Sequence, residues 1–377
     1  MRTLSVRVAG SGEGHGGEVF SCVHTPDSAY VLSAGWDGSL RLWLSSNGQQ
    51  VTALPAGPKP LSCCAVSPDG ATWVSASMDG LLSWWDAMTH QMKMNFVAHI
   101  RPISAIQYSP DGQSLATASW DRKIQVRKLG KERDGLSLGN HHDIVAGCRW
   151  SSDGKQLLSW SHDSTLRLWD TESGRELACL QGHEDRVTAA CLSIDGQWAV
   201  SGGRDGVVKL WDLRQRVEVR SVQQSSEIRG CFCLLDGESI VTVNADGWAV
   251  MWSLPELEAQ GELDTGIKVM CGDLSPSGSQ LALGSEDGFI HLIALDGLED
   301  LPVLVTPTQT FRPKKSVLSR ILGGEKMERA YQYTCPVCRH VTEVTSLPDR
   351  TISCSACKRL IRLQGEARQL QPQRGGV

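Results

Sequence analysis

The stretch Ser159–Asp170, which reads SWSHDSTLRLWD, carries the pattern that decides the fold. A serine stands four residues before Asp163, and Trp169 stands six residues after it. His141 lies 22 residues before the same aspartate. Polar and apolar residues alternate along Thr165–Leu168, as they do in a half-buried β-strand. The stretch therefore predicts strand structure around a marked aspartate.

The same pattern recurs seven times, with the aspartates 41 or 42 residues apart. The seven anchors are Asp37, Asp79, Asp121, Asp163, Asp205, Asp246 and Asp287. Four residues earlier come Ser33, Ser75, Thr117, Ser159, Ser201 and Thr242, and six residues later come Trp43, Trp85, Trp169, Trp211 and Trp252. His15, His99, His141 and His183 stand 22 residues before their anchors. Such periodicity predicts an array of equivalent units.

A period near 42, with Gly-His near the start of a unit and Trp-Asp near its end, resembles the WD40 family. The pairs here are Gly14-His15, Gly182-His183, Trp169-Asp170 and Trp211-Asp212. The resemblance covers about residues 1–300. It implies an all-β fold, a seven-bladed β-propeller whose blades have four strands each.

The resemblance also implies a buried hydrogen-bond relay within a blade. The aspartate would cap a tight turn, the histidine would bridge aspartate and serine, and the serine would reach the indole N–H. Blades 1, 4 and 5 hold the full set, namely His15, Ser33, Asp37, Trp43, His141, Ser159, Asp163, Trp169, His183, Ser201, Asp205 and Trp211. Blades 2 and 6 lack the histidine, blade 3 has Arg127 for the tryptophan, and blade 7 keeps only Asp287.

Recurring His, Ser and Asp could suggest a catalytic triad. A triad needs one site, whereas this set occurs three times in full. We therefore expect a structural relay. No phosphate-binding loop, activated nucleophile or carboxylate pair is recognisable, so we expect no enzyme and no small-molecule substrate.

In the WD40 family, the residue before the anchor aspartate lies on the loop-lined face around the channel. Those residues are Trp36, Met78, Trp120, His162, Arg204, Ala245 and Glu286. Trp, Met and Arg are enriched at interfaces, so all but Ala245 are candidate partner-binding residues. The alternative is that some of them pack against neighbouring blades. We expect a scaffold that binds other proteins on this face.

Two segments could close the last blade. Thr3–Val8 can add an N-terminal strand, and Leu301–Leu304 stands where the repeat would place an outer strand. Pro302 and Pro307 weaken the second option. The N-terminal strand is therefore favoured.

Most cysteines of the repeat region are expected to pack in the core. Cys22, Cys64, Cys148 and Cys231 each lie 15 residues before their aspartate, on one face of the first strand. Small apolar side chains suit such a face.

A change in charge marks a boundary. Residues 1–304 hold 24 Lys/Arg against 37 Asp/Glu, a net charge of −13, whereas residues 305–377 hold 13 against 5, a net charge of +8. We expect a propeller over 1–304, a linker over 305–330 that can hold a short helix in SVLSRILGG, a ribbon over 331–364, and a flexible tail over 365–377.

The ribbon carries two C-x-x-C pairs separated by 15 residues, which is the spacing of a four-cysteine zinc site. They are Cys335, Cys338, Cys354 and Cys357. HVTEV and RTIS are predicted strands of a hairpin that brings the pairs together. The pattern resembles a zinc ribbon or a rubredoxin-like knuckle, although Arg339 and Lys358 stand where both families often have glycine. Four cysteines leave no open position, so we expect one structural Zn²⁺ per chain, with iron as the alternative.

The basic ribbon could serve as a second docking module. Alternatively, it could bind nucleic acid through residues such as Arg339, Lys358 and Arg362. Against the second option, no aromatic pattern accompanies these charges, and the acidic propeller would repel phosphate.

No run of about 18 apolar residues occurs, and the stretch MRTLSVRV lacks the apolar centre of a signal peptide. We expect a cytoplasmic protein that does not enter a membrane. Its 13 cysteines then have no disulfide framework to form.

Overall fold

The computed structural model describes residues 4–7, 14–131 and 134–295, together with short strands between 303 and 369. All regular elements in these residues are β-strands, which confirms the predicted all-β class. The chain divides into two compact units, the smaller of which includes Glu299–Val377. None of the described residues form a helix long and apolar enough to span a membrane.

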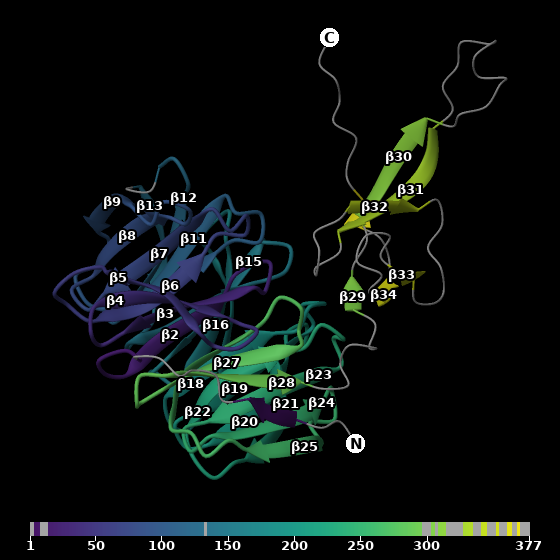
Figure 1. Cartoon of the computed structure of the whole chain (residues 1–377). Helices are drawn as coiled ribbons and strands as arrows, with labels where there is room; N and C mark the ends of the chain where they lie inside the picture. Colours follow the sequence, from purple (N-terminus) through teal and green to yellow (C-terminus); the bar gives the residue numbers. More distant parts are fainter. Residues whose placement is uncertain are drawn as a thin grey trace. The chain divides into compact units, whose positions relative to one another are not determined.

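The larger unit consists of seven sheets of four strands (Figure 1). Their strands are, in blade 1, β2 (Val19–His24), β3 (Tyr30–Gly35), β4 (Ser39–Leu44) and β5 (Gln50–Pro55); in blade 2, β6 (Leu61–Val66), β7 (Thr72–Ser77), β8 (Leu81–Asp86) and β9 (Met92–Val97); in blade 3, β10 (Ile103–Tyr108), β11 (Ser114–Ser119), β12 (Lys123–Lys128) and β13 (Gly135–Asn140); in blade 4, β14 (Val145–Trp150), β15 (Gln156–Ser161), β16 (Thr165–Asp170) and β17 (Glu176–Gln181); in blade 5, β18 (Val187–Leu192), β19 (Trp198–Gly203), β20 (Val207–Asp212) and β21 (Val217–Gln223); in blade 6, β22 (Ile228–Cys233), β23 (Ser239–Asn244), β24 (Trp248–Ser253) and β25 (Ala259–Asp264); and in blade 7, β26 (Val269–Leu274), β27 (Gln280–Ser285), β28 (Ile290–Leu295) and β1 (Leu4–Arg7).

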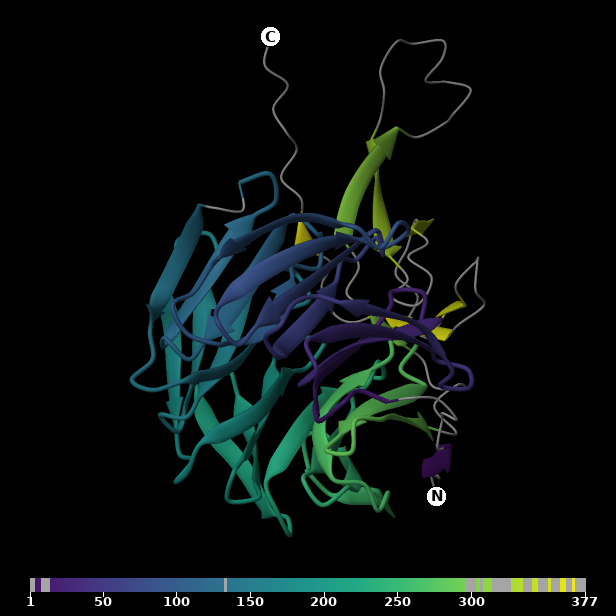
Figure 2. The ribbon, with the colours of Figure 1, turned by 60° about the vertical axis from the view of Figure 1, so that its left-hand side comes forward.

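Within blades 1 to 6 the four strands pair antiparallel in sequence order. The first strand of each blade contacts the first strand of the next, and β2 also contacts β26. These seven contacts close the unit into a ring. The successive sheets can be followed by colour in Figures 1 and 2. The seven-bladed propeller is thus confirmed.

The N-terminal strand closes the ring. β1 pairs antiparallel with β28, with Leu4 opposite Leu295 and Arg7 opposite Leu292. The favoured closure is therefore the observed one. The competing segment contributes instead to β29 (Val303–Val305), which pairs with β34 (Leu360–Leu363).

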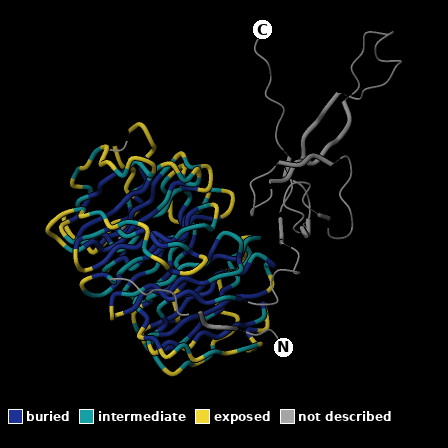
Figure 3. Tube along the Cα trace, viewed as in Figure 1, coloured by how far each residue is buried: buried dark blue, intermediate teal, exposed yellow. Residues whose placement is uncertain are grey.

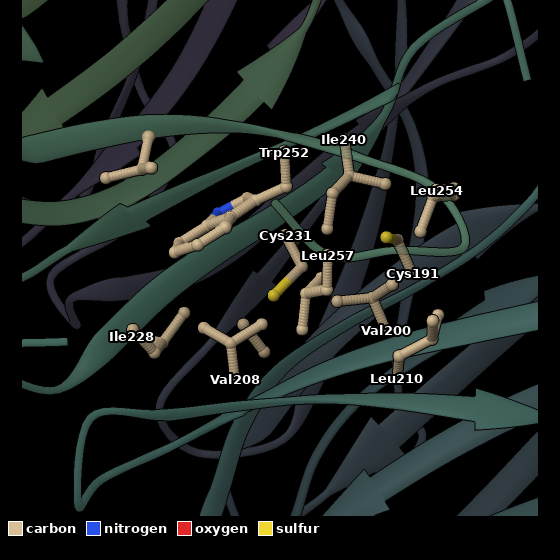
Figure 4. Close-up of a cluster of buried hydrophobic side chains, with 12 residues drawn as sticks. Cys191, Val200, Val208, Leu210, Ile228, Cys231, Ile240, Trp252, Leu254 and Leu257 are labelled. Atoms are coloured by element: carbon tan, nitrogen blue, oxygen red, sulfur yellow. The ribbon is translucent and has the colours of Figure 1, made fainter. Parts of the chain in front are cut away.

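The core lies between adjacent blades. Buried residues concentrate in the inner strands of the blades, whereas the turns and outer strands such as β9 and β21 are largely exposed (Figure 3). Between blades 5 and 6, Val208 and Leu210 pack with Ile228 and Trp252 (Figure 4). Burying a large apolar side chain stabilises by about 1.5–3 kcal/mol. Because each blade shares its core with its neighbours, no blade is independent of the ring.

Most repeat-region cysteines belong to this core, as predicted, whereas Cys179, Cys233 and Cys271 are only half-buried. Cys22, Cys64, Cys148 and Cys231 are buried. Burial raises the pKa of the Cys64 and Cys148 thiols to about 12. Because the thiolate is the reactive form, these groups are inert at neutral pH.

The smaller unit differs from the sequence prediction in its strands. β30 (Thr308–Pro313) pairs with β31 (Met327–Thr334), so much of the segment expected as linker is sheet. The part that could hold a short helix, 316–324, lies outside the described residues.

The strands beside the cysteine pairs also pair differently from the expected hairpin. β32 (Val341–Val344) pairs with β31, whereas β33 (Ile352–Ser353) pairs with β34. HVTEV and RTIS are therefore in separate sheets rather than opposite each other. A further short strand, β35 (Arg368–Gln369), falls in the expected tail. Cys335, Cys338, Cys354 and Cys357 lie outside the described residues.

Candidate partner-binding face

A hydrogen-bond relay holds the turn between the second and third strands of a blade. In blade 4, Trp169 Nε1 donates to Ser159 Oγ at 2.8 Å, and Ser159 Oγ lies 2.8 Å from His141 Nε2. His141 Nδ1 lies 2.9 Å from Asp163 Oδ2. Blade 1 has the same relay through His15, and its distances are 2.7–2.9 Å. The predicted relay is confirmed in these two blades.

The relay serines face the interior. Ser33, Ser159 and Ser201 are fully buried, and each accepts a hydrogen bond from an indole. A nucleophile must reach its substrate, and these hydroxyls have no path to solvent. The His–Ser–Asp sets therefore act as structural supports.

Blade 5 corrects one part of the prediction. His183 Nε2 lies 2.7 Å from Ser201 Oγ, and Trp211 donates to the same oxygen. However, His183 Nδ1 is buried without a hydrogen-bond partner, so its link to Asp205 is not made. Asp205 keeps the bond that closes the turn, since it accepts the backbone N–H of Val207 at 2.9 Å, as Asp163 accepts that of Thr165. The relay in this blade ends at the histidine.

Blade 6 contains a substitute that the sequence pattern did not reveal. Gln224 occupies the histidine position, 22 residues before Asp246. Its Nε2 donates to Thr242 Oγ1 at 2.6 Å, while Trp252 Nε1 donates to the same oxygen at 2.8 Å. The amide of Gln224 therefore replaces the contact that histidine Nε2 makes with the relay hydroxyl in other blades.

His183 should make stability depend on pH. Burial lowers its pKa to about 4, below the usual 6.5. The unfolded chain then binds the proton more readily, so the free energy of unfolding should fall as the pH drops from about 6.5 to about 4, by up to about 3 kcal/mol. His183→Gln, which copies blade 6, should flatten this slope. Denaturant unfolding of the unsubstituted protein and of His183→Gln at several pH values measures how the free energy of unfolding changes with pH. Parallel slopes for the two proteins would contradict the assignment.

Blade 3 replaces the tryptophan with a buried arginine. Arg127 Nη1 donates to Thr117 Oγ1 at 3.0 Å, in the place of the indole N–H, and Nη2 donates to the Ala98 carbonyl at 3.1 Å. The guanidinium carbon lies 5.9 Å from the centre of the Phe96 ring. Arg127 Nε has no partner, and burial lowers the pKa of Arg127 to about 10. The charge is thus held inside the blade at a cost.

Arg127→Trp should stabilise the propeller by about 1–3 kcal/mol, because a buried charge is replaced by an apolar ring that keeps one donor. Arg127 contacts Ala98, and the equivalent alanine one repeat earlier is Ala56. In blade 2, Trp85 packs in one cluster with Ala56, so a tryptophan ring fits beside an alanine at this position. Chemical denaturation would measure the gain. The reverse change, Trp85→Arg, is the matched control and should destabilise. A loss of stability in Arg127→Trp would show that the guanidinium contacts outweigh the desolvation cost.

The seven predicted face residues occupy equivalent positions. In every blade, the N–H of the residue before the anchor aspartate donates to the carbonyl of the residue that precedes the first strand, at 2.8–3.1 Å. The donors are Trp36, Met78, Trp120, His162, Arg204, Ala245 and Glu286. One repeated hydrogen bond thus places all seven at the same end of the ring, where the relay holds the turn.

Their exposure differs between blades. Trp36 is 53% exposed and Trp120 is 46% exposed. Arg204 and Glu286 are also exposed, whereas Met78, His162 and Ala245 are half-buried. Two large aromatic rings therefore reach solvent from the same kind of turn.

Trp36 packs partly on its own blade. Its ring centre lies 6.0 Å from that of Phe20, at an angle of 59°. The position of Gly17 lies against it, since a Cβ there would come within 3.0 Å of Trp36 Cβ. The remaining half of the ring is open to solvent.

Trp120 has neighbours that the sequence pattern did not indicate. Ile100, Arg101, Arg122 and Ile144 line a pocket with it. A signal that could have revealed them is Ile100, an aliphatic residue in the loop directly after the relay His99. His162 belongs to the next blade, where burial and the nearby Arg186 lower its pKa. His162 is therefore neutral at neutral pH.

In residues 14–131 and 134–295, no group of three or more His, Cys, Asp or Glu side chains is arranged to hold a metal ion. The four ribbon cysteines lie outside the described residues, so the predicted zinc site stays a prediction.

Seven four-stranded blades in a closed ring, with one repeated turn, define the class of seven-bladed β-propellers. The family model described as "WD domain, G-beta repeat" matches residues 7–43, 48–86, 91–127, 135–170 and 174–212. The chain belongs to the WD40-repeat proteins. Blades 6 and 7 lie beyond the matched ranges; blade 6 has Gln224 at the histidine position, and blade 7 has Leu283 and Ile293 at the serine and tryptophan positions. A search of curated proteins found no match to the chain.

Proposed function

We propose that this propeller is a non-enzymatic scaffold that binds another protein on the face formed by Trp36, Met78, Trp120, His162, Arg204 and Glu286. The WD40 fold supports a role in protein interaction. The observation that carries the proposal is the exposure of Trp36 and Trp120 at equivalent turns. Exposed rings of this size are costly in water and typical of interface anchors.

Trp36→Ala and Trp120→Ala should each weaken capture of the main partner about thirtyfold, since an interface anchor contributes about 2 kcal/mol or more. Partner capture by the full chain and its thermal unfolding are measured together. Met88→Ala provides the control, because Met88 is 92% exposed in the turn between β8 and β9, at the other end of its blade. Both variants melting early while capturing the same proteins would place the rings in the core and refute the proposal.

Nucleic acid is the competing partner. It would bind through the basic residues 305–377, which carry a net charge of +8. Salt-sensitive RNA or DNA binding that disappears when 305–377 is deleted, with no protein recovered, would favour that function instead.

We further propose that Cys335, Cys338, Cys354 and Cys357 hold one structural zinc ion, so that the ribbon serves as a second docking module. The paired strands around them support this. Thr334 pairs with Val341, and Ser353 pairs with Leu360. Each C-x-x-C pair therefore falls in the short connection of a β-hairpin. Two such connections can present four thiolates to one tetrahedral metal, with no position left for water.

A further inference from the structure

A pocket of about 420 Å³ opens at the turns of blades 3 and 4. It is lined by Ile100, Arg101, Trp120, Asp121, Arg122 and Ile144, and it is called here the Trp120 pocket. Its residues come from three turns: the one before β10, the one between β11 and β12, and the one before β14.

Hydrogen bonds hold the three turns together. Trp120 N–H and Ser119 Oγ both donate to the Pro102 carbonyl at 2.9 Å. His141 N–H donates to the Arg122 carbonyl at 3.2 Å, which links the turn before β14 to that of blade 3. The walls of the pocket are therefore preformed, which lowers the entropy cost of binding.

The pocket exposes apolar surface. Ile100 is 83% exposed, beside the half-exposed Trp120 ring. His99 brings these residues together, because its ring bridges Thr117 and Asp121 at 2.9 and 2.8 Å. An aliphatic side chain and an indole side by side suit a bulky apolar side chain of a ligand.

Positive charge surrounds that apolar surface. Arg101 and Arg122 are exposed, and among the described residues neither guanidinium forms an ion pair. The acidic residue of the lining, Asp121, is paired with His99 at 2.8 Å, and its side chain is 5% exposed. The charge that the pocket offers to a ligand is thus positive.

We propose that the Trp120 pocket binds an extended segment of a partner protein in which a bulky apolar residue lies next to an Asp or Glu. The apolar side chain packs between Ile100 and Trp120, and the carboxylate pairs with Arg101 and Arg122. This assignment rests on the proposed function, since it names the partner chemistry at one part of that face.

Other polyanions and the chain's own tail fit less well. Residues 1–304 carry a net charge of −13, which repels the many phosphates of a nucleic-acid backbone. A single carboxylate is repelled less and can pair with the two nearby arginines. Residues 305–377 carry +8 and do not supply the complementary charge. A short acidic and apolar peptide matches both features of the pocket.

The probe is a panel of fluorescein-labelled short peptides in a Gly/Ser background, each with one Leu, Phe or Trp and a glutamate next to it or two positions away. Fluorescence polarisation with the full chain should detect binding that weakens with salt. Ile100→Ala and Trp120→Ala should weaken it about thirtyfold. The double variant Arg101→Gln/Arg122→Gln should weaken it about tenfold and remove the salt dependence. Met88→Ala should leave it unchanged.

Three outcomes would overturn the proposal. They are no peptide binding up to about 1 mM, equal binding when glutamate is replaced by glutamine, and displacement of the peptides by a single-stranded oligonucleotide that itself binds more tightly. Thermal unfolding checks that each variant is folded. Loss of partner capture in Trp36→Ala, without peptide binding, would refute the pocket assignment and leave the scaffold function standing. Capture unaffected by either Trp variant would refute the proposed face and place the binding surface elsewhere, whereas no capture by the unsubstituted chain would refute the scaffold function.

Discussion

Replacing Asp163 with alanine should lower the free energy of unfolding of the propeller by about 3 kcal/mol. Its side chain is 6% exposed and accepts hydrogen bonds from His141 Nδ1, from the backbone N–H groups of His142 and Thr165, and from Thr165 Oγ1. The substitution would leave these donors without their acceptor inside the blade. Urea denaturation, followed by far-ultraviolet circular dichroism, measures the loss.

Asp287→Ala is the matched control, because Asp287 anchors the equivalent turn of blade 7. Its side chain is 63% exposed. It is not without partners, since Ser285 Oγ and the Phe289 N–H both donate to it, but these contacts are local. A loss of about 1 kcal/mol is expected. Equal shifts for the two variants would contradict the relay as a source of stability.

The Asp163 relay should also weaken in acid. Burial alone would raise the pKa of Asp163, but hydrogen bonds from His141 and Thr165 outweigh it and hold the pKa well below the usual range. A carboxylate with a lowered pKa stabilises the folded state above about pH 4 and loses that contribution as the pH falls further. As the pH falls below 4, the free energy of unfolding of Asp163→Ala should therefore decrease less than that of the unsubstituted protein.

Removal of zinc is the second change with a large expected effect. The purified chain should contain one zinc per molecule by elemental analysis. Cys354→Ser should lose most of it, because structural zinc binding contributes on the order of 10 kcal/mol to the folding of small metal domains. Hydrogen exchange should then quicken in β33 and β34, while the propeller keeps its unfolding transition, because the chain divides into two compact units.

Cys179→Ser is the control for this experiment. Cys179 lies on β17 of the propeller and is only half-buried, so its replacement should leave both the zinc content and the ribbon unchanged. Zinc well below one per chain, or a visible absorption band of iron, would refute the zinc assignment.

Much of the fold could be predicted because the repeat is local. The aspartate, serine, tryptophan and histidine of a blade form hydrogen bonds over 10 to 22 residues, so their spacing follows directly from the strand and turn geometry of one unit. That is why the seven blades, the relays of blades 1 and 4, and the equivalent positions of Trp36 and Trp120 all agree with the sequence pattern.

The spacing of the repeat did not predict which hydrogen bonds the substituted relay residues form. The pattern showed that blade 3 lacks tryptophan and blade 6 lacks histidine, but not that Arg127 and Gln224 bond to the same hydroxyls. Nor did it show that His183 lacks its link to Asp205. Hydrogen-bond geometry depends on side-chain positions to within a fraction of an ångström, which spacing does not specify.

The sequence by itself therefore determined the class of fold, the number of blades and the residues that each turn presents. Only the tertiary structure decided that Leu4–Arg7 closes the ring against Ile290–Leu295, and that Ile100, Arg122 and Ile144 gather around Trp120. The reason is physical. The repeat is governed by hydrogen bonds within one unit, whereas closure and the pocket join segments of different blades, whose meeting depends on how the whole ring packs.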